Sequence, residues 1–491
     1  MFSGLDALKS AVFELGIEVL TYVPGYPITG VADALFAECA VNEKVALETA
    51  LGASATGARA MVLVKHVGMN VLADPLLISA SHTIGSAVVV IAGDDLGPQG
   101  SQAEMDSRYF GTLSQLPLFD PAGPSSLFQS LAEACSVSEE IKAPAIVRIT
   151  PRLTGAEEDS IRRPSIPRER HKRFDPAIWN LTARGRAQRF YGQVIPALEE
   201  RSHNSGLNFL REAGEAGPGL GLGIIASGHP AFLCRDLPAS LFVPGYVHPL
   251  PWERLCRFAA AHDPVLVAEE PWPFIESQLC GLSGLRGRLT GHLPYGPLEA
   301  EDLERALQLL REERVAGPAV QPETAAQRKG RSICDDCPFL SLFRAIGRME
   351  VPVAGDAGCS ILAVRQPVQA VDVAYGLGSS IGVASGFRKK GIAVIGDYAF
   401  AHSGVQGLMN ARWQKKSLLA IVVRNGVAAM TGGQEAIDPE PLLQALAPDL
   451  IRLEETAIED EIVELLASEL SRPGLSAIMA SGTCPRQGPP S

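Results

Sequence analysis

Three stretches of this chain alternate short apolar runs, rich in β-branched residues, with amphipathic helical patterns. Such alternation is typical of parallel sheets covered by helices, because parallel strands are buried on both faces and need a crossover connection. At roughly 150 residues per domain, the chain has room for about three domains. The pattern therefore predicts an α/β protein with three doubly wound α/β domains.

Two polar segments divide these stretches. Residues 156–215, rich in Arg, Pro and Glu, predict an irregular connector, and residues 316–331 predict a linker. The expected domains are then residues 1–155, 216–315 and 332–491. Their clearest expected strands are residues 60–64, 86–92 and 144–149 in the first domain, 222–226 and 264–268 in the second, and 392–395, 418–423 and 475–480 in the third.

Charge and hydropathy exclude two classes of partner. The formal net charge of −12 argues against sequence-independent binding of nucleic acid, which needs a basic surface. No apolar run approaches the roughly 20 residues of a membrane helix. The first residues predict an amphipathic helix with Leu5, Leu8 and Val12 on one face, rather than a signal peptide. We therefore expect a cytoplasmic protein.

The most informative motif pairs two polar residues that each follow an expected strand. Gly396 and Asp397 end one apolar run, and Asn425 follows the next run, 28 positions after Asp397. An expected helix, Ser403–Trp413, lies between the two runs. Open α/β sheets bind ligands at the carboxyl ends of their strands. The spacing therefore predicts that Asp397 and Asn425 face the same ligand.

The ligand chemistry that suits these oxygens is a magnesium ion bound to a diphosphate. Mg²⁺ prefers hard oxygen ligands and shares them with phosphates, so Asp397, Asn425 and the Val427 carbonyl are its expected ligands. Gly432, after Thr431, allows the backbone to approach phosphates closely. The alternative is that Gly-Asp and Asn-Gly are ordinary turns, but the strand–helix–strand spacing favours the site.

These segments resemble a known family. Gly396–Gly404 and Asn425–Gln434 look like the diphosphate-binding segment of indolepyruvate ferredoxin oxidoreductase, large (alpha) subunit, a thiamine-diphosphate-dependent 2-oxoacid:ferredoxin oxidoreductase. Gly376–Gly382 resembles the glycine-rich element that lies against the cofactor, which implies that Gly378 binds there. Tyr398 departs from the usual motif, which has Gly at that position. The resemblance covers nearly the whole chain.

The resemblance assigns a role to each expected domain. Residues 1–155 would be the pyrimidine-binding domain, 216–315 a transketolase C-terminal-like domain without catalytic residues, and 332–491 the diphosphate-binding domain. Thiamine chemistry needs a carboxylate at the aminopyrimidine ring. In the family's pattern this Glu stands nine positions before a Gly, which selects Glu48 against Gly57 rather than Glu43.

Substrate contacts are also implied by the resemblance. Tyr22–Thr29 looks like the substrate-side loop of the family, which places Thr29 to hydrogen-bond a carboxylate. The segments that begin at Lys65 and contain Arg108 are similar to those of the aryl-pyruvate branch, and either cation could bind the carboxylate. Surface ion pairs are the alternative for both. His402 would face the thiazolium ring and move a proton, unless it is a structural histidine at a helix start.

Four cysteines match the ligands of a [4Fe–4S] cluster in the wider family. Cys334 and Cys337 form a CxxC pair, and Cys359 and Cys484 would complete the set. Zinc would also suit four soft ligands, and a redox-active CxxC pair is a weaker alternative. Unlike the family, the chain shows no closely spaced run of four cysteines before Ser491, so a C-terminal ferredoxin domain is expected to be absent.

The resemblance implies oxidative decarboxylation of a 2-oxoacid, such as indolepyruvate, to an acyl-CoA. It implies thiamine diphosphate, Mg²⁺ and one [4Fe–4S] cluster as cofactors. The implied partners are coenzyme A, ferredoxin or another electron acceptor, a small gamma- or beta-type subunit, and a second copy of this chain in a homodimer. Two alternatives stay open. One is non-oxidative decarboxylation or carboligation, and the other is a non-catalytic scaffold subunit.

Overall fold

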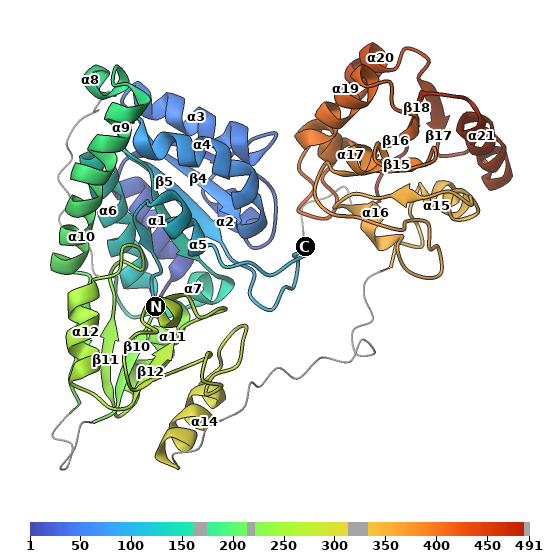
Figure 1. Cartoon of the computed structure of the whole chain (residues 1–491). Helices are drawn as coiled ribbons and strands as arrows, with labels where there is room; N and C mark the ends of the chain where they lie inside the picture. The colour runs from blue at the N-terminus through green and yellow to red at the C-terminus, as the bar shows by residue number, and fades with distance from the viewer. Residues whose placement is uncertain (162–173, 214–220, 313–331, 486–491) are drawn as a thin grey trace. The chain divides into compact units, whose positions relative to one another are not determined.

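The computed structural model describes residues 1–161, 174–213, 221–312 and 332–485. The chain forms two compact units, residues 1–322 and 323–491. The first unit contains a six-stranded sheet, a five-stranded sheet and a two-stranded sheet of β1 (Phe2–Ser3) and β8 (Glu157–Glu158), and the second unit contains one five-stranded sheet (Figure 1). The predicted α/β class with several mainly parallel sheets is confirmed. The predicted linker 316–331 lies outside the described residues.

The six-stranded sheet of the first unit is parallel throughout, in the order β3-β2-β4-β5-β7-β6. The chain runs from β2 to β3 on one side and then crosses to β4 on the other side of β2. This reversal is a topological switch point, where open α/β sheets form a ligand crevice at the carboxyl ends of the strands. The strands are β2 (Ile17–Tyr22), β3 (Glu38–Cys39), β4 (Arg59–Lys65), β5 (Val88–Gly93), β6 (Leu118–Phe119) and β7 (Ala145–Ile149).

Helix α3 (Glu43–Ala55) begins directly after β3, at the carboxyl edge of this sheet. The Asn42 side chain caps it by accepting a hydrogen bond of 2.9 Å from the Val45 amide. Helices α3 and α4 (Met69–Ser81) lie side by side (Figure 1). The residue at the start of α3 is therefore held at the switch point, while later residues of α3 lie further from it.

The connector is helical where the prediction expected irregular structure. After residue 174 it forms α8 (Pro176–Trp179), α9 (Ala183–Arg189), a π-helical turn and α10 (Ile195–Asn204), and then β9 (Phe209–Arg211). Buried Phe190, Val194 and Leu198 recur every four residues and give this polar segment one apolar stripe. Arg201 also pairs with Glu133 of α6 (Pro124–Ile141) at 2.7 Å. The many Arg, Pro and Glu residues around this stripe led to the prediction of irregular structure, which is wrong for these helices.

The second sheet of the first unit has the order β13-β12-β10-β11-β9. Its strands pair in parallel except the edge strand β9, which is antiparallel to β11. The predicted strands β10 and β12 are confirmed. The elements are β10 (Gly223–Ala226), β11 (Ser240–Val243), β12 (Val265–Ala268) and β13 (Leu285–Arg286), with helices α11 (Gly228–Leu233), α12 (Trp252–Ala260) and α14 (Ala300–Arg311).

A buried ionic network joins the six-stranded and the five-stranded sheet of the first unit. Arg108 is fully buried and donates to Asp106 at 2.6 Å and to Glu269 at 2.7 Å. It also donates to the Trp272 carbonyl at 2.9 Å. Burial lowers the pKa of Arg108, but the two carboxylates outweigh burial and raise it. The guanidinium is therefore a structural cation between the sheets.

Replacing Arg108 with Met should strongly destabilise the first unit. The substitution leaves Asp106 and Glu269 buried without their cation, which costs roughly 3–5 kcal/mol. Chemical denaturation measures this loss. Arg305→Ala is the matched control, because its pair with Asp302 is exposed and is worth at most about 1 kcal/mol. Equal losses for the two variants would contradict the structural role.

The second unit contains a parallel sheet in the order β14-β15-β16-β18-β17. The strands are β14 (Val353–Ala354), β15 (Ile392–Gly396), β16 (Leu418–Arg424), β17 (Ile451–Glu454) and β18 (Leu475–Ser481). Helix α19 (Val405–Trp413) follows a π-helical turn and confirms the helix predicted between β15 and β16. Among the described residues, no helix is long and apolar enough to cross a membrane.

Candidate active site

Asp397 and Asn425 meet at the carboxyl ends of two neighbouring strands. β15 and β16 pair in parallel up to Gly396 and Val423, so the residues that follow them share one edge. The Asp397 carboxylate accepts hydrogen bonds from the backbone N–H of Asn425 at 3.0 Å and from the backbone N–H of Gly426 at 2.7 Å. The two halves of the predicted motif are therefore joined in one structure.

The electrostatics of Asp397 suit a bound cation. Its side chain is buried, and burial raises the pKa of this carboxyl, whereas backbone hydrogen bonds from Gly426, Tyr398 and Asn425 oppose the increase. Oδ2 accepts the backbone amides of both Asn425 and Gly426, whereas Oδ1 accepts the Tyr398 amide and has a second lone pair for a cation. A divalent ion would stabilise the charged form, so the donor set fits Mg²⁺ shared with phosphate oxygens.

The segment after β16 offers backbone groups to a phosphate. The Asn425 side-chain oxygen accepts from the Val427 amide at 3.1 Å, which fixes the start of the turn. Gly432 and Gly433 both have positive φ, of 124° and 76°. Those conformations suit glycine, and because both residues lack a side chain, the backbone after Thr431 stays open to a ligand. The Val427 carbonyl accepts from the Ala429 amide, so it is already engaged in the turn.

Gly378 is packed against the helix that follows β15. A Cβ there would lie 3.0 Å from the Ala399 carbonyl oxygen, and its φ is 82°. The buried Asp356 carboxylate accepts from the amides of Gly378 and Ser380 at 2.6 and 3.0 Å and holds this turn. The sequence did not single out Asp356, although it also follows a strand end, after β14.

His402 lies in the same part of the second unit. Its side chain is buried, and its Nδ1 is 3.1 Å from the Ser403 hydroxyl. Ser403 in turn donates to the Leu377 carbonyl at 2.9 Å, next to Gly378. His402 is thus tied through Ser403 to the glycine turn, and its predicted proton transfer stays a prediction.

At the switch point of the first unit, the structure brings Glu43 and Lys65 into one neighbourhood. Glu43 is buried at the start of α3, and a Cβ at Gly68 would lie only 2.8 Å from its Cδ. Lys65 ends β4, and burial lowers the pKa of its ammonium, while Asp95 and Glu43 raise it. Thr29 is near this loop edge, where its hydroxyl oxygen accepts from the Gly25 amide at 2.9 Å.

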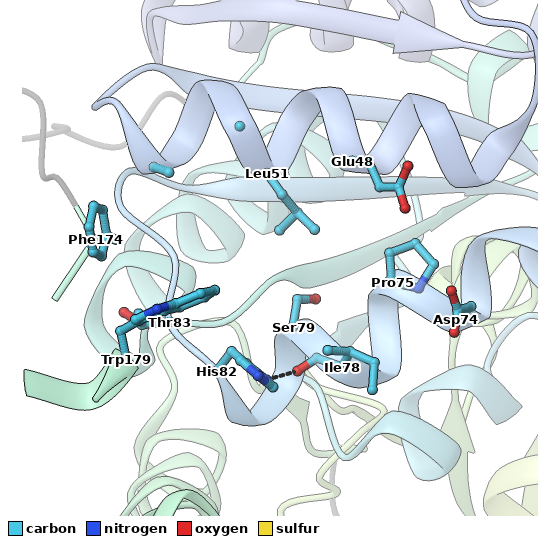
Figure 2. A pocket seen from close by; sticks show the side chains of 12 residues that line it. Glu48, Leu51, Asp74, Pro75, Ile78, Ser79, His82, Thr83, Phe174 and Trp179 are labelled. Atoms are coloured by element: carbon cyan, nitrogen blue, oxygen red, sulfur yellow. Dashed lines mark hydrogen bonds between the residues drawn. The ribbon is translucent and has the colours of Figure 1, made fainter. Parts of the chain in front are cut away.

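Glu48 lies elsewhere, on the exposed side of α3. Its side chain is 49% exposed and 3.6 Å from Lys44. Figure 2 shows Glu48 and Leu51 on α3 facing Pro75 and Ile78 on α4, across a cavity of about 700 Å³. The geometry therefore favours Glu43 over Glu48 as the buried carboxylate of the site.

The signal for Glu43 was present in the sequence. Glu43 stands nine positions before Gly52, the same spacing that selected Glu48 before Gly57. Only the start of α3, however, lies at the carboxyl edge of the sheet. Arg108, the second cation predicted to bind the substrate carboxylate, is fully buried and paired with Asp106 and Glu269, so it is unavailable to a substrate in this structure.

Three of the four predicted cluster cysteines share one region of the second unit. Burial raises the pKa of the Cys337 thiol, and Cys334 and Cys484 lie close enough to raise it further. Cys359 begins α16 (Cys359–Leu362), after β14. Within the described parts of the chain, no group of three or more Cys, His, Asp or Glu side chains is arranged to hold a metal ion. The four thiols are thus not assembled as a ligand set.

Comparisons with known proteins first define the class. Residues 356–449 match the family "Thiamine pyrophosphate enzyme, C-terminal TPP binding domain". A solved structure of 2-oxoglutarate:ferredoxin oxidoreductase from Magnetococcus marinus shares the fold, with a TM-score of 0.50 and 14% identity over 63% of this chain. The match covers 64% of that chain, slightly less than two thirds. The chain therefore carries the cofactor-binding domain of a thiamine pyrophosphate enzyme.

Within that class, the similarity extends over most of the chain. It is 29% identical to indolepyruvate oxidoreductase subunit IorA of Methanothermobacter thermautotrophicus, over 88% of this chain and 76% of the relative. It is 28% identical to IorA of Archaeoglobus fulgidus, over 98% and 86% respectively. The chain is a relative of these indolepyruvate oxidoreductase subunits. The predicted resemblance and the prediction of an oxidoreductase enzyme are confirmed at this level.

Proposed function

We propose that this chain is the thiamine-diphosphate-binding subunit of an enzyme that oxidatively decarboxylates a 2-oxoacid. The single observation that carries the proposal is the hydrogen-bonded pairing of Asp397 with Asn425 and Gly426 at adjoining strand ends. That pairing lies within residues 356–449, which match the cofactor-binding family. An aryl-pyruvate such as indolepyruvate is the proposed substrate, because the relatives are named indolepyruvate oxidoreductase subunits.

In the second unit, this chain's residues would hold the diphosphate end. Asp397 and Asn425 would supply oxygens to Mg²⁺, with the Val427 carbonyl as a further ligand. Thr431, Gly432 and the turn at Gly378 would place backbone amides and a hydroxyl near the phosphates. His402, tied to that turn through Ser403, would hold or move a proton on the thiazolium side.

In the first unit, Glu43 is the carboxylate we propose for the aminopyrimidine ring. Glu43 is buried at the switch point of the six-stranded sheet, whereas Glu48 is exposed and paired with Lys44. Thiamine diphosphate, when bound, supplies the electron sink for decarboxylation. A buried carboxylate that holds one proton at the ring nitrogen is what Glu43 would contribute.

Lys65 is the proposed contact for the substrate carboxylate, with Thr29 as a second hydrogen-bond donor. The Lys65 ammonium donates to the Gly100 carbonyl at 3.1 Å. An ammonium has three N–H donors, so donors remain for a carboxylate. The Thr29 hydroxyl accepts from Gly25, and its own hydrogen can still be donated.

Electron transfer and assembly complete the proposal. Cys334, Cys337, Cys359 and Cys484 are the proposed ligands of a [4Fe–4S] cluster, although their thiols are not gathered as a metal site here. A small gamma- or beta-type subunit, ferredoxin or another acceptor, coenzyme A and a homodimer of this chain are the proposed partners.

The experiment is an anaerobic assay of the purified chain together with its co-purifying subunits. Indolepyruvate, thiamine diphosphate, Mg²⁺ and coenzyme A are supplied, and oxidised methyl viologen accepts the electron pair. We expect one carbon dioxide and one acyl-CoA for every two reduced viologens, because each methyl viologen accepts a single electron, with iron and sulfide in the protein. Carbon dioxide without reduced viologen would indicate non-oxidative decarboxylation instead. No turnover of any 2-oxoacid would favour a scaffold subunit.

A further inference from the structure

A loop after β5 is built around one buried carboxylate that the sequence motifs did not include. Asp95 is 1% exposed and follows the buried strand β5 at its carboxyl end. Its oxygens accept hydrogen bonds from the Gln99 amide at 3.0 Å, the Gly100 amide at 2.9 Å and the Ser101 hydroxyl at 2.6 Å. Three donors converging on one carboxylate fix the path of residues 95–101, which we name the Asp95 loop.

The Asp95 loop is what holds Lys65. The Gly100 amide donates to Asp95, while the Gly100 carbonyl accepts from the Lys65 ammonium at 3.1 Å. A Cβ at Gly100 would lie 3.0 Å from the Tyr26 Cβ, and a Cβ at Gly25 would lie 2.9 Å from the Lys65 Cδ. Glycine at these two positions therefore lets the lysine stem and the loop pack closely against the segment after β2.

A histidine ties the loop to its two ends. The Asp95 amide donates to His66 Nδ1 at 3.2 Å, which leaves the hydrogen on Nε2 to donate to the Ala103 carbonyl at 3.0 Å. His66 is fully buried and directly follows Lys65. The backbone on either side of the loop is thus anchored to the residue next to the lysine.

Charge adds to this geometry. Burial lowers the pKa of Lys65, whereas the charges of Asp95 and, to a smaller extent, Glu43 raise it. Glu43 comes from the start of α3 and Asp95 from the end of β5. A lysine must stay protonated to bind a carboxylate, so a fixed negative charge nearby favours the binding form.

We propose that Asp95 is a positioning residue, which fixes the Gly100 carbonyl and thereby aims the Lys65 ammonium at the carboxylate of the 2-oxoacid. The inference rests on the proposed function, and it adds a residue that does not itself touch the substrate. It predicts that Asp95 governs substrate affinity more than the chemical step.

The test compares Asp95→Asn with Glu104→Gln in the active enzyme. An asparagine can accept on only one side, so either Gln99 or the Gly100–Ser101 pair loses its acceptor. Glu104→Gln is the matched control, because it removes a charge that bonds the Gly97 amide and not the part of the loop holding Lys65. We expect KM for indolepyruvate to rise about tenfold in Asp95→Asn, with kcat changed less than about threefold.

Ser101→Ala is the second variant, because it keeps the charge and removes one of the three donors. It should raise KM by a smaller factor, and it keeps the test usable if Asp95→Asn folds poorly. An unchanged KM in both variants, or an equal fall in kcat and kcat/KM, would overturn the positioning role. If the wild-type enzyme turns over no 2-oxoacid, the proposed function fails first, and that result is distinct from either outcome.

Discussion

Replacing Asp397 with Asn should weaken the binding of thiamine diphosphate with Mg²⁺ on the order of 100-fold or more, with activity lost in parallel. The variant removes the site's only proposed anionic ligand. It also breaks hydrogen bonds, because Asp397 accepts amides on both carboxylate oxygens and an asparagine can accept on one side only. Calorimetric titration with the cofactor and the viologen assay measure both effects.

The control for this prediction is Asp438→Asn in the same unit. Asp438 pairs with Arg424 at 3.1 Å, close in sequence to the site, but its side chain is 49% exposed. Affinity for thiamine diphosphate should therefore stay within a few-fold of wild type in the control. Cofactor binding that survives in Asp397→Asn would contradict the magnesium role, provided that the variant is folded.

Replacing Glu43 with Gln should abolish most of the activity and leave the cofactor bound. A positioned acid–base group contributes typically about 10²- to 10⁴-fold to rate, so kcat should fall within that range. Glutamine is close in shape to glutamate, and the packing of Glu43 against Gly68 should be preserved. Steady-state kinetics at saturating thiamine diphosphate measure the loss.

Glu48→Gln is the matched control on the same helix. Its side chain is half exposed and paired with Lys44, so kcat should change less than about twofold. The two variants thus decide which glutamate of α3, Glu43 or Glu48, is the carboxylate at the aminopyrimidine ring. A large loss in Glu48→Gln together with an active Glu43→Gln would overturn our assignment and restore the one that the Gly57 spacing predicted.

The strand pattern and the Asp397–Asn425 spacing could be predicted because both depend on local sequence. Residues 418–423 are uniformly apolar and form the buried strand β16, and the polar residue after such a strand must emerge at the sheet edge. For that reason, the strands of the second unit and the position of its polar residues could be predicted from the sequence.

Other features depend on contacts between distant residues. Arg108 finds its partner Glu269 161 positions away, and no local pattern distinguishes that pair from a surface cation. Helical periodicity likewise could not separate Glu43 from Glu48. What decides between them is which end of α3 lies at the switch point, and that follows from the order of strands in the sheet.

The most direct test of the central claim is a calorimetric titration of the purified protein with thiamine diphosphate, once with Mg²⁺ and once with EDTA. The account predicts saturable binding at one site per chain in Mg²⁺, and binding too weak to saturate in EDTA, because Asp397 and Asn425 hold the diphosphate only through the ion. Binding of equal strength in both buffers, or no binding by the folded wild-type protein, would contradict it.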